Sequence, residues 1–139
     1  MLTTQSITNK KIWENFLSNE YKGFFPLFQT WQWGDVQKSL GFAVERIGLF
    51  DQKKLVGIAQ VVEIKAKRGH YLHVRQGPAI ENKKKYWSYF FQEIVRLGKQ
   101  KHVAFIRISP LLPKAEALSF HFLPLQRQYI IWMQKFVGF

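Results

Sequence analysis

Residues 83–99 constrain the fold of this chain more than any other segment. Their large apolar side chains recur at helical spacing along one side, and they are Tyr86, Phe90, Ile94 and Leu97. Residues 103–108 (VAFIRI) follow closely and have the pattern of a buried strand. Because strand patterns also precede this helix, the segment predicts a β-helix-β crossover.

The strands before that helix form a meander. Residues 43–50 (AVERIGLF) and 55–65 (LVGIAQVVEIK) are rich in strand-forming residues, and a short turn joins them as a hairpin. A turn at residues 67–69 leads into a third strand at residues 70–75, which a Gly-Pro pair ends. Antiparallel strands followed by one crossover predict a mixed sheet.

Two shorter helices are expected before the hairpin. Thr8 is the expected N-cap of the first helix, which places Trp13 and Leu17 on one side. Thr30 is the expected N-cap of the second helix (TWQWGDVQKSL), and Gly41 is its expected stop.

The last part of the chain is expected to hold a short helix around residues 114–118 and a strand at residues 127–133. The element order is then α, α, β, β, β, α, β, short α, β. This order predicts an α/β (α+β) fold in which helices flank a mixed, mainly antiparallel sheet. The 139 residues correspond to a single domain.

The chain is strongly basic, with 21 Lys and Arg against 9 Asp and Glu and a formal charge of +12. Self-repulsion of this size destabilises a compact domain, which favours an anionic partner. Nucleic acid, phosphorylated small molecules and an anionic membrane surface are the classes of partner that fit. The alternative is a basic protein whose scattered lysines serve solubility.

Several kinds of chemistry lack support in the sequence. Cysteine is absent, which excludes disulfides, thiolate metal sites and a cysteine nucleophile. The four histidines lack metal-ligand spacing, so no metal is expected. The sequence contains no glycine-rich phosphate loop, no nucleophile elbow, no signal peptide and no membrane-spanning apolar run. No catalytic residue is assigned.

Four segments carry a resemblance to a known family. They are FQTWQWG with QKSLG at residues 28–41, KLVGIAQ at residues 54–60, YLHVRQGP at residues 71–78 and FIRISP at residues 105–110. In order and spacing these segments resemble the first half of Fem-type (FemABX) aminoacyltransferases, the enzymes of the peptidoglycan interpeptide bridge. The resemblance extends over residues 24–110.

The resemblance implies a GNAT-like fold and the transfer of an amino acid from aminoacyl-tRNA to the stem peptide of a peptidoglycan precursor. The implied partners are aminoacyl-tRNA and a nucleotide- or lipid-linked muropeptide, with contact to an anionic membrane surface and no DNA. Because an aminoacyl ester is already activated, no cofactor beyond this co-substrate is expected. The implied location is the cytoplasm, at the inner face of the cell membrane.

Members of this family contain two GNAT-like domains, and residues 1–139 resemble the first. The second domain is expected to be absent. The chain is therefore expected to be a first-domain fragment or a truncated product, without activity of its own.

The resemblance also implies a precursor-binding cleft. Lys38 is the nearest match to a lysine that contacts the phosphates of the precursor in the family. Trp33 would form a wall of the same cleft, and its alternative role is in the core of the helix. Arg75 and Gln76 precede the Gly-Pro pair, where the family commonly has Arg or Lys.

Two further residues belong to this expected cleft. Gly77 would permit a close approach of the backbone to the ligand, and Tyr71 is a further candidate for a cleft contact. The chain departs from the pattern at Ser109, where some relatives carry an acidic residue before the proline.

Two other functions remain open from the sequence. A GNAT-type N-acetyltransferase would use acetyl-CoA, but the glycine-rich loop that binds its pyrophosphate is missing. A non-enzymatic nucleic-acid-binding domain fits the charge and the aromatic content, but no known RNA-binding motif is present.

Overall fold

The structure is a computed structural model, and it describes residues 1–21, 25–67, 69–81, 83–111 and 130–133. Its strands are β1 (Leu2–Ser6), β2 (Ala43–Asp51), β3 (Lys54–Ala66), β4 (Gly69–Val74), β5 (Ala79–Ile80), β6 (Phe105–Ile108) and β7 (Ile130–Met133). They form a sheet in the order β1-β2-β3-β4-β6-β7, and β5 pairs with β3.

The sheet is mixed, as the sequence predicts. The strands β1 to β4 are joined by antiparallel pairing, and β5 is antiparallel to β3. The strand β6 is parallel to β4, and β7 is parallel to β6. The connection from β4 to β6 contains the helix α3 (Lys84–Gln100), so the expected β-helix-β crossover is confirmed.

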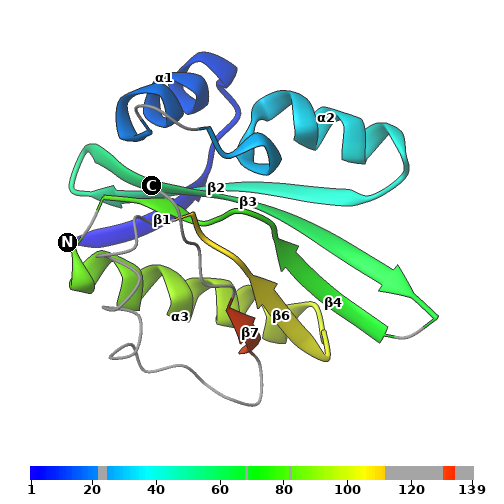
Figure 1. Cartoon of the computed structure of the whole chain (residues 1–139). Helices are drawn as coiled ribbons and strands as arrows, with labels where there is room; N and C mark the ends of the chain where they lie inside the picture. Colours follow the sequence, from blue (N-terminus) through cyan, green and yellow to red (C-terminus); the bar gives the residue numbers. More distant parts are fainter. Residues whose placement is uncertain (22–24, 68, 82, 112–129, 134–139) are drawn as a thin grey trace.

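The helices cover both faces of the sheet. Figure 1 shows α1 (Lys10–Glu20) and α2 (Trp31–Ser39) above the sheet and α3 below it. A single turn of 3-10 helix, η1 (Leu27–Gln29), leads directly into α2. Among the described helices, none is both long enough and apolar enough to cross a bilayer.

Each face of the sheet has its own apolar core. On the α3 side, Phe90 and Ile94 belong to a buried cluster with Leu72 and Ile106. On the α1 side, Trp13 and Leu17 are buried with Ile7 and Ile58. The helical stripes that the sequence predicts therefore face the sheet, and the predicted fold class is confirmed.

The N-terminal segment differs from the expectation. Residues Leu2–Ser6 form an edge strand that the sequence did not predict, because their polar composition has no strand pattern. The first helix is capped by Asn9 and not by Thr8. The Asn9 side chain accepts hydrogen bonds from the backbone N–H groups of Lys11 (2.9 Å) and Ile12 (3.2 Å), which satisfies two free donors of the first turn.

The other helix signals agree with the structure. The hydroxyl of Thr30 accepts a hydrogen bond from the N–H of Trp33, and Gly41 has a φ of +94°, which favours glycine. The short helix expected at residues 114–118 lies outside the described residues. The last strand is described from Ile130 onward.

Candidate binding site

The site is built around the buried side chain of Gln29, at the end of η1. Its amide nitrogen donates to the carbonyl of Arg75 (2.7 Å) and to that of Gln60 (3.3 Å). Its amide oxygen accepts from the backbone N–H of Gln60 (2.8 Å). One side chain thus joins η1 to the middle of β3 and to the residue that follows β4.

The side chain of Gln60 continues this network towards α2. Its nitrogen donates to the carbonyl of Thr30 (2.8 Å), and its oxygen accepts from Nε of Arg46 (3.0 Å). The Arg46 side chain is buried and also donates to a carboxylate oxygen of Asp35 (2.9 Å). Among the described residues, no buried side-chain nitrogen or oxygen lacks a partner. The network is therefore complete, which is the condition for buried polar groups to stabilise a fold.

Gln76 and Ser109 close the network at the ends of β4 and β6. The Gln76 side-chain oxygen accepts a hydrogen bond from the backbone N–H of Phe28 (3.0 Å), and the backbone N–H of Gln76 donates to the hydroxyl of Ser109 (3.0 Å). Gln76 adopts a φ of 54°, a left-handed conformation that non-glycine residues keep when their surroundings fix it. The four segments that carry the family resemblance therefore meet in space.

Glycines at two positions make this arrangement possible. A Cβ at position 77 would lie 2.5 Å from the amide carbon of Gln29. A Cβ at position 34 would contact the side chains of Gln60 and Arg46. Gly77 is thus required for the approach of Gln29 to the backbone, and the expected approach of a ligand at this residue stays a prediction.

A hollow of about 140 Å³ opens beside the network, between α2 and the strands β3 and β4. Its lining residues are Phe28, Trp33, Gln37, Gln60, Val62, Ile64, His73 and Arg75. Trp33 and Arg75, which the sequence analysis places in one cleft, both line this hollow.

Aromatic rings position the guanidinium of Arg75 in this hollow. The Arg75 guanidinium lies over the ring of Phe28, 3.7 Å from its centre. The ring of Trp33 meets the same phenyl ring edge to face, with 4.7 Å between the ring centres. Because Gln29 fixes the Arg75 carbonyl, both the backbone and the side chain of Arg75 are positioned.

His73 lies in the same hollow as a neutral group. Burial, together with the charges of Arg107 and Arg75, lowers the pKa of His73 to about 4. An imidazole with so low a pKa is a weak base at neutral pH, because efficient proton transfer needs a pKa near the working pH. The hollow is therefore better suited to binding an anion or an aromatic group than to acid-base catalysis.

Tyr71 lies beside this hollow and does not line it. Its ring stacks on that of Phe105, with 4.6 Å between the centres and 9° between the planes. The Arg107 guanidinium is 5.7 Å from the centre of the Tyr71 ring. Tyr71 and His73 point to one face of β4, so Tyr71 extends the surface around the hollow.

Lys38 lies at a different place from the other predicted residues. It lines a second hollow, of about 310 Å³, between α2, the start of β2 and the segment that follows β1. Trp31 and Arg46 line this second hollow as well. The structure therefore brings Trp33, Arg75, Gln76 and Gly77 together and places Lys38 on another side of α2.

The residues that organise the site are mostly ones the sequence analysis did not select. Gln29 and Gln60 stand inside the segments that carry the resemblance, and this position was the available signal. His73 is partly buried, and strand alternation alone says nothing about the two arginines near it. Within the described residues, no group of three or more His, Cys, Asp or Glu side chains has the arrangement of a metal site.

Comparison with known proteins identifies the family of the chain. The model of the FemAB family matches residues 8–120. The chain belongs to the FemAB family. No curated protein matches the sequence.

One solved structure has a similar fold. It is described as the crystal structure of FemX, and it superposes with a TM-score of 0.71 at 18% sequence identity. The match covers 84% of this chain and 30% of the FemX chain. This FemAB-family chain thus has the fold of about one third of FemX and spans much less than its full length.

Proposed function

We propose that this chain provides the precursor-binding part of an aminoacyltransferase that adds an amino acid to the stem peptide of a peptidoglycan precursor. Membership of the FemAB family supports this reaction class. In the proposed reaction, aminoacyl-tRNA supplies the activated amino acid and a nucleotide- or lipid-linked muropeptide supplies the amine. The proposed location is the cytoplasm, beside the inner face of the cell membrane.

The position of Arg75 is the observation that carries the proposal. Its guanidinium is exposed on one side, lies on the Phe28 ring, and is anchored through its carbonyl by Gln29. Guanidinium groups bind phosphate and carboxylate through two parallel hydrogen bonds. A positioned arginine beside Trp33 in a small hollow therefore fits one anionic group of the precursor and an apolar part next to it.

Lys38 is proposed as a second, separate contact with the precursor. Its hollow is distinct from that of Arg75, so one small group does not reach both side chains. A nucleotide-linked muropeptide is long and carries several charges, and it has the size to contact both sides of α2. Tyr71 and Arg107 lie next to the Arg75 hollow and form the proposed continuation of this surface.

Calorimetric titration of the chain with a nucleotide-linked muropeptide tests the proposal. Arg75→Ala is expected to weaken binding by about 10- to 100-fold, because a charge-assisted pair is lost. Arg96→Ala is the matched control, since Arg96 lies on α3, is exposed, and pairs with Glu93. The affinity of Arg96→Ala for the muropeptide is expected to equal that of the unmodified chain.

Two results would contradict this function. Equal losses of muropeptide affinity in Arg75→Ala and Arg96→Ala would mean that the precursor is attracted by net charge alone. Stabilisation of the chain by acetyl-CoA with no binding of muropeptide would instead support the N-acetyltransferase function.

A further inference from the structure

The strand β1 has one unpaired edge. The Met1 carbonyl accepts from the N–H of Gln52 (3.0 Å), and the N–H of Ile7 donates to the Arg46 carbonyl (2.9 Å). Odd-numbered residues of β1 therefore face β2. By strand alternation, Leu2, Thr4 and Ser6 direct their backbone N–H and C=O groups away from β2. Within the part of the chain that the structure describes, β1 pairs with β2 alone.

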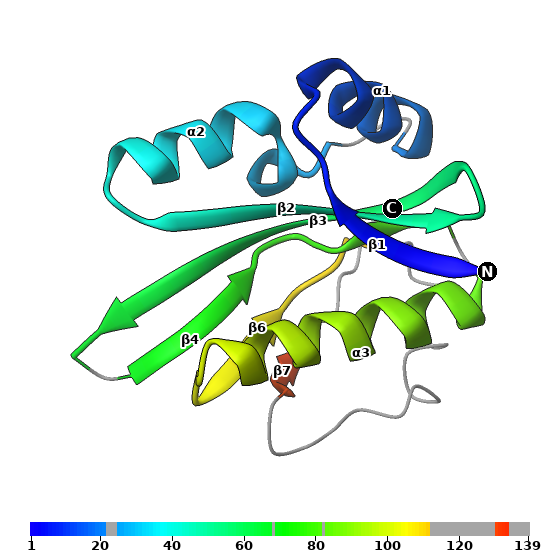
Figure 2. The ribbon, with the colours of Figure 1, turned by 180° about the vertical axis from the view of Figure 1, so that it is seen from behind.

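This edge lacks the features that usually prevent pairing with another chain. The sequence LTTQS contains no charged residue and no proline, whereas exposed edges are commonly protected by lysine, proline or a bulge. Its register with β2 runs without a shift from Leu2 to Ser6. Figure 2 shows β1 along the border of the sheet, with α3 beneath it.

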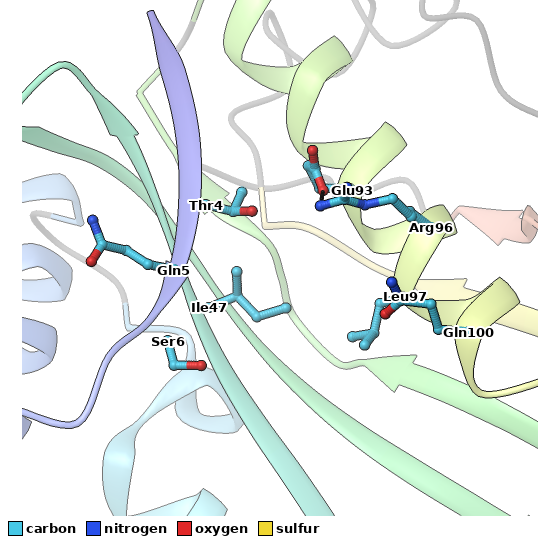
Figure 3. A pocket seen from close by; sticks show the side chains of 8 residues that line it. All are labelled: Thr4, Gln5, Ser6, Ile47, Glu93, Arg96, Leu97 and Gln100. Atoms are coloured by element: carbon cyan, nitrogen blue, oxygen red, sulfur yellow. Dashed lines mark ion pairs between the residues drawn. The ribbon is translucent and has the colours of Figure 1, made fainter.

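A groove runs beside the unpaired edge, between β1 and α3. Figure 3 shows that Thr4 of β1 and Ile47 of β2 point towards α3, where Leu97 lies opposite. The groove has a volume of about 190 Å³. On the α3 side its border carries one acidic and one basic residue, Glu93 and Arg96, which form an ion pair.

We propose that β1 is a dimerisation edge that pairs with β1 of a second copy of this chain, antiparallel about a two-fold axis at Thr4. With this axis, Thr4 lies opposite Thr4 of the second copy, and Leu2 lies opposite Ser6. Every outward N–H and C=O group of the strand then has a partner, because hydrogen-bonded antiparallel pairs exchange both bonds. The sheet continues across the axis, and the two α3 helices lie on the same face.

The charges beside the edge favour a second copy over an unrelated strand. In a two-fold contact the same surface meets itself, so it must be self-complementary. Glu93 and Arg96 present opposite charges on one helix face, so each can pair within its own helix or across the axis. The formal charge of +12 repels a second copy at long range, so dimerisation is expected to strengthen as salt is added.

Engineered disulfides test this register, because the chain contains no cysteine. In Thr4→Cys, the two Cα atoms across the axis would be about 5.5 Å apart, a distance at which disulfides form. Oxidation is expected to convert most of this variant into a covalent dimer. Gln5→Cys is the matched control: Gln5 is more exposed than Thr4, but it lies opposite Thr3 of the second copy.

Sedimentation equilibrium of the unmodified chain and of Thr4→Pro gives the second readout. Thr4→Pro removes an outward N–H and leaves the bonds to β2 intact, so the dimer is expected to be lost. The urea midpoint is expected to match that of the unmodified chain at concentrations where both are monomeric. The proposal is overturned if Gln5→Cys crosslinks as readily as Thr4→Cys. It is equally overturned if the unmodified chain sediments as a monomer at all concentrations and salt levels.

Discussion

The side chain of Gln29 occupies the space that a side chain at position 77 would need. The amide carbon of Gln29 lies 2.5 Å from the point where a Cβ of residue 77 would be. The same amide donates to the carbonyl of Arg75, two residues earlier. The loop after β4 and the turn before α2 are therefore shaped by each other.

Gln29→Leu is expected to destabilise the fold by about 2–4 kcal/mol. Leucine has a similar size, but it leaves the buried N–H of Gln60 and the carbonyl of Arg75 without the Gln29 partner. Urea unfolding measures the change. Gln32→Leu is the control, because Gln32 is exposed and bonds Glu14 at the surface, and its cost is expected to be below about 0.5 kcal/mol.

Gly77→Ala is expected to cost about 1–3 kcal/mol, because the added methyl group overlaps the Gln29 amide. The same substitution in a Gln29→Ala background should cost clearly less, since the competing side chain is then absent. Unfolding free energies of the single and double variants give this coupling. Additive effects would show that Gly77 is needed for another reason.

Stability is expected to fall as the pH decreases from 6.5 towards 4, because of His73. The unfolded chain binds a proton at this residue near pH 6.5, whereas the folded chain does so near pH 4. The folded state therefore binds fewer protons than the unfolded state in this window. The free energy of unfolding rises with pH, and the contribution of His73 is fully present above pH 6.5. After allowance for partial solvent exposure, the effect is about 2 kcal/mol.

The histidine contribution can be separated from those of the carboxylates. His73→Gln cannot take up the proton, so the slope of stability between about pH 5 and 6.5 should largely disappear in this variant. His102→Gln, at an exposed histidine, should keep the slope. If both variants behave alike, the slope comes from groups outside the hollow.

Arg75 and Lys38 are expected to contribute independently to precursor binding. They line different hollows beside α2, and substitutions without shared partners are usually additive within about 0.5 kcal/mol. Calorimetry on Arg75→Ala, Lys38→Ala and the double variant measures the coupling. A coupling above about 1 kcal/mol would place both side chains on one group of the ligand.

The helices and strands whose apolar residues recur at regular spacing were predictable from the sequence. The stripe of Phe90 and Ile94 identified α3, and the strand runs around it identified the hairpin and the crossover. The strand β1 was not predictable, since LTTQS becomes a strand through pairing with β2 and not through its own pattern. Thr8 and Asn9 are both good N-caps, and local sequence does not choose between them.

The centre of the candidate site was less predictable than its border. Gln29 and Gln60 are polar residues, which are exposed in most proteins, yet both are buried here because each satisfies the other. The direction of Lys38 depends on how α2 rotates on the sheet, which Gly34 and the Arg46 network determine. Neither fact is contained in any single segment.

The contact between Arg75 and Phe28 has a consequence for the speed of ligand capture. Among the described residues, the Arg75 guanidinium packs on the Phe28 ring and forms no ion pair with a carboxylate, so its charge is not neutralised before the ligand arrives. Arg107 adds a second positive charge near the same hollow. An anionic ligand is thus drawn in from solution, and its association rate should fall steeply with ionic strength while its dissociation rate changes little.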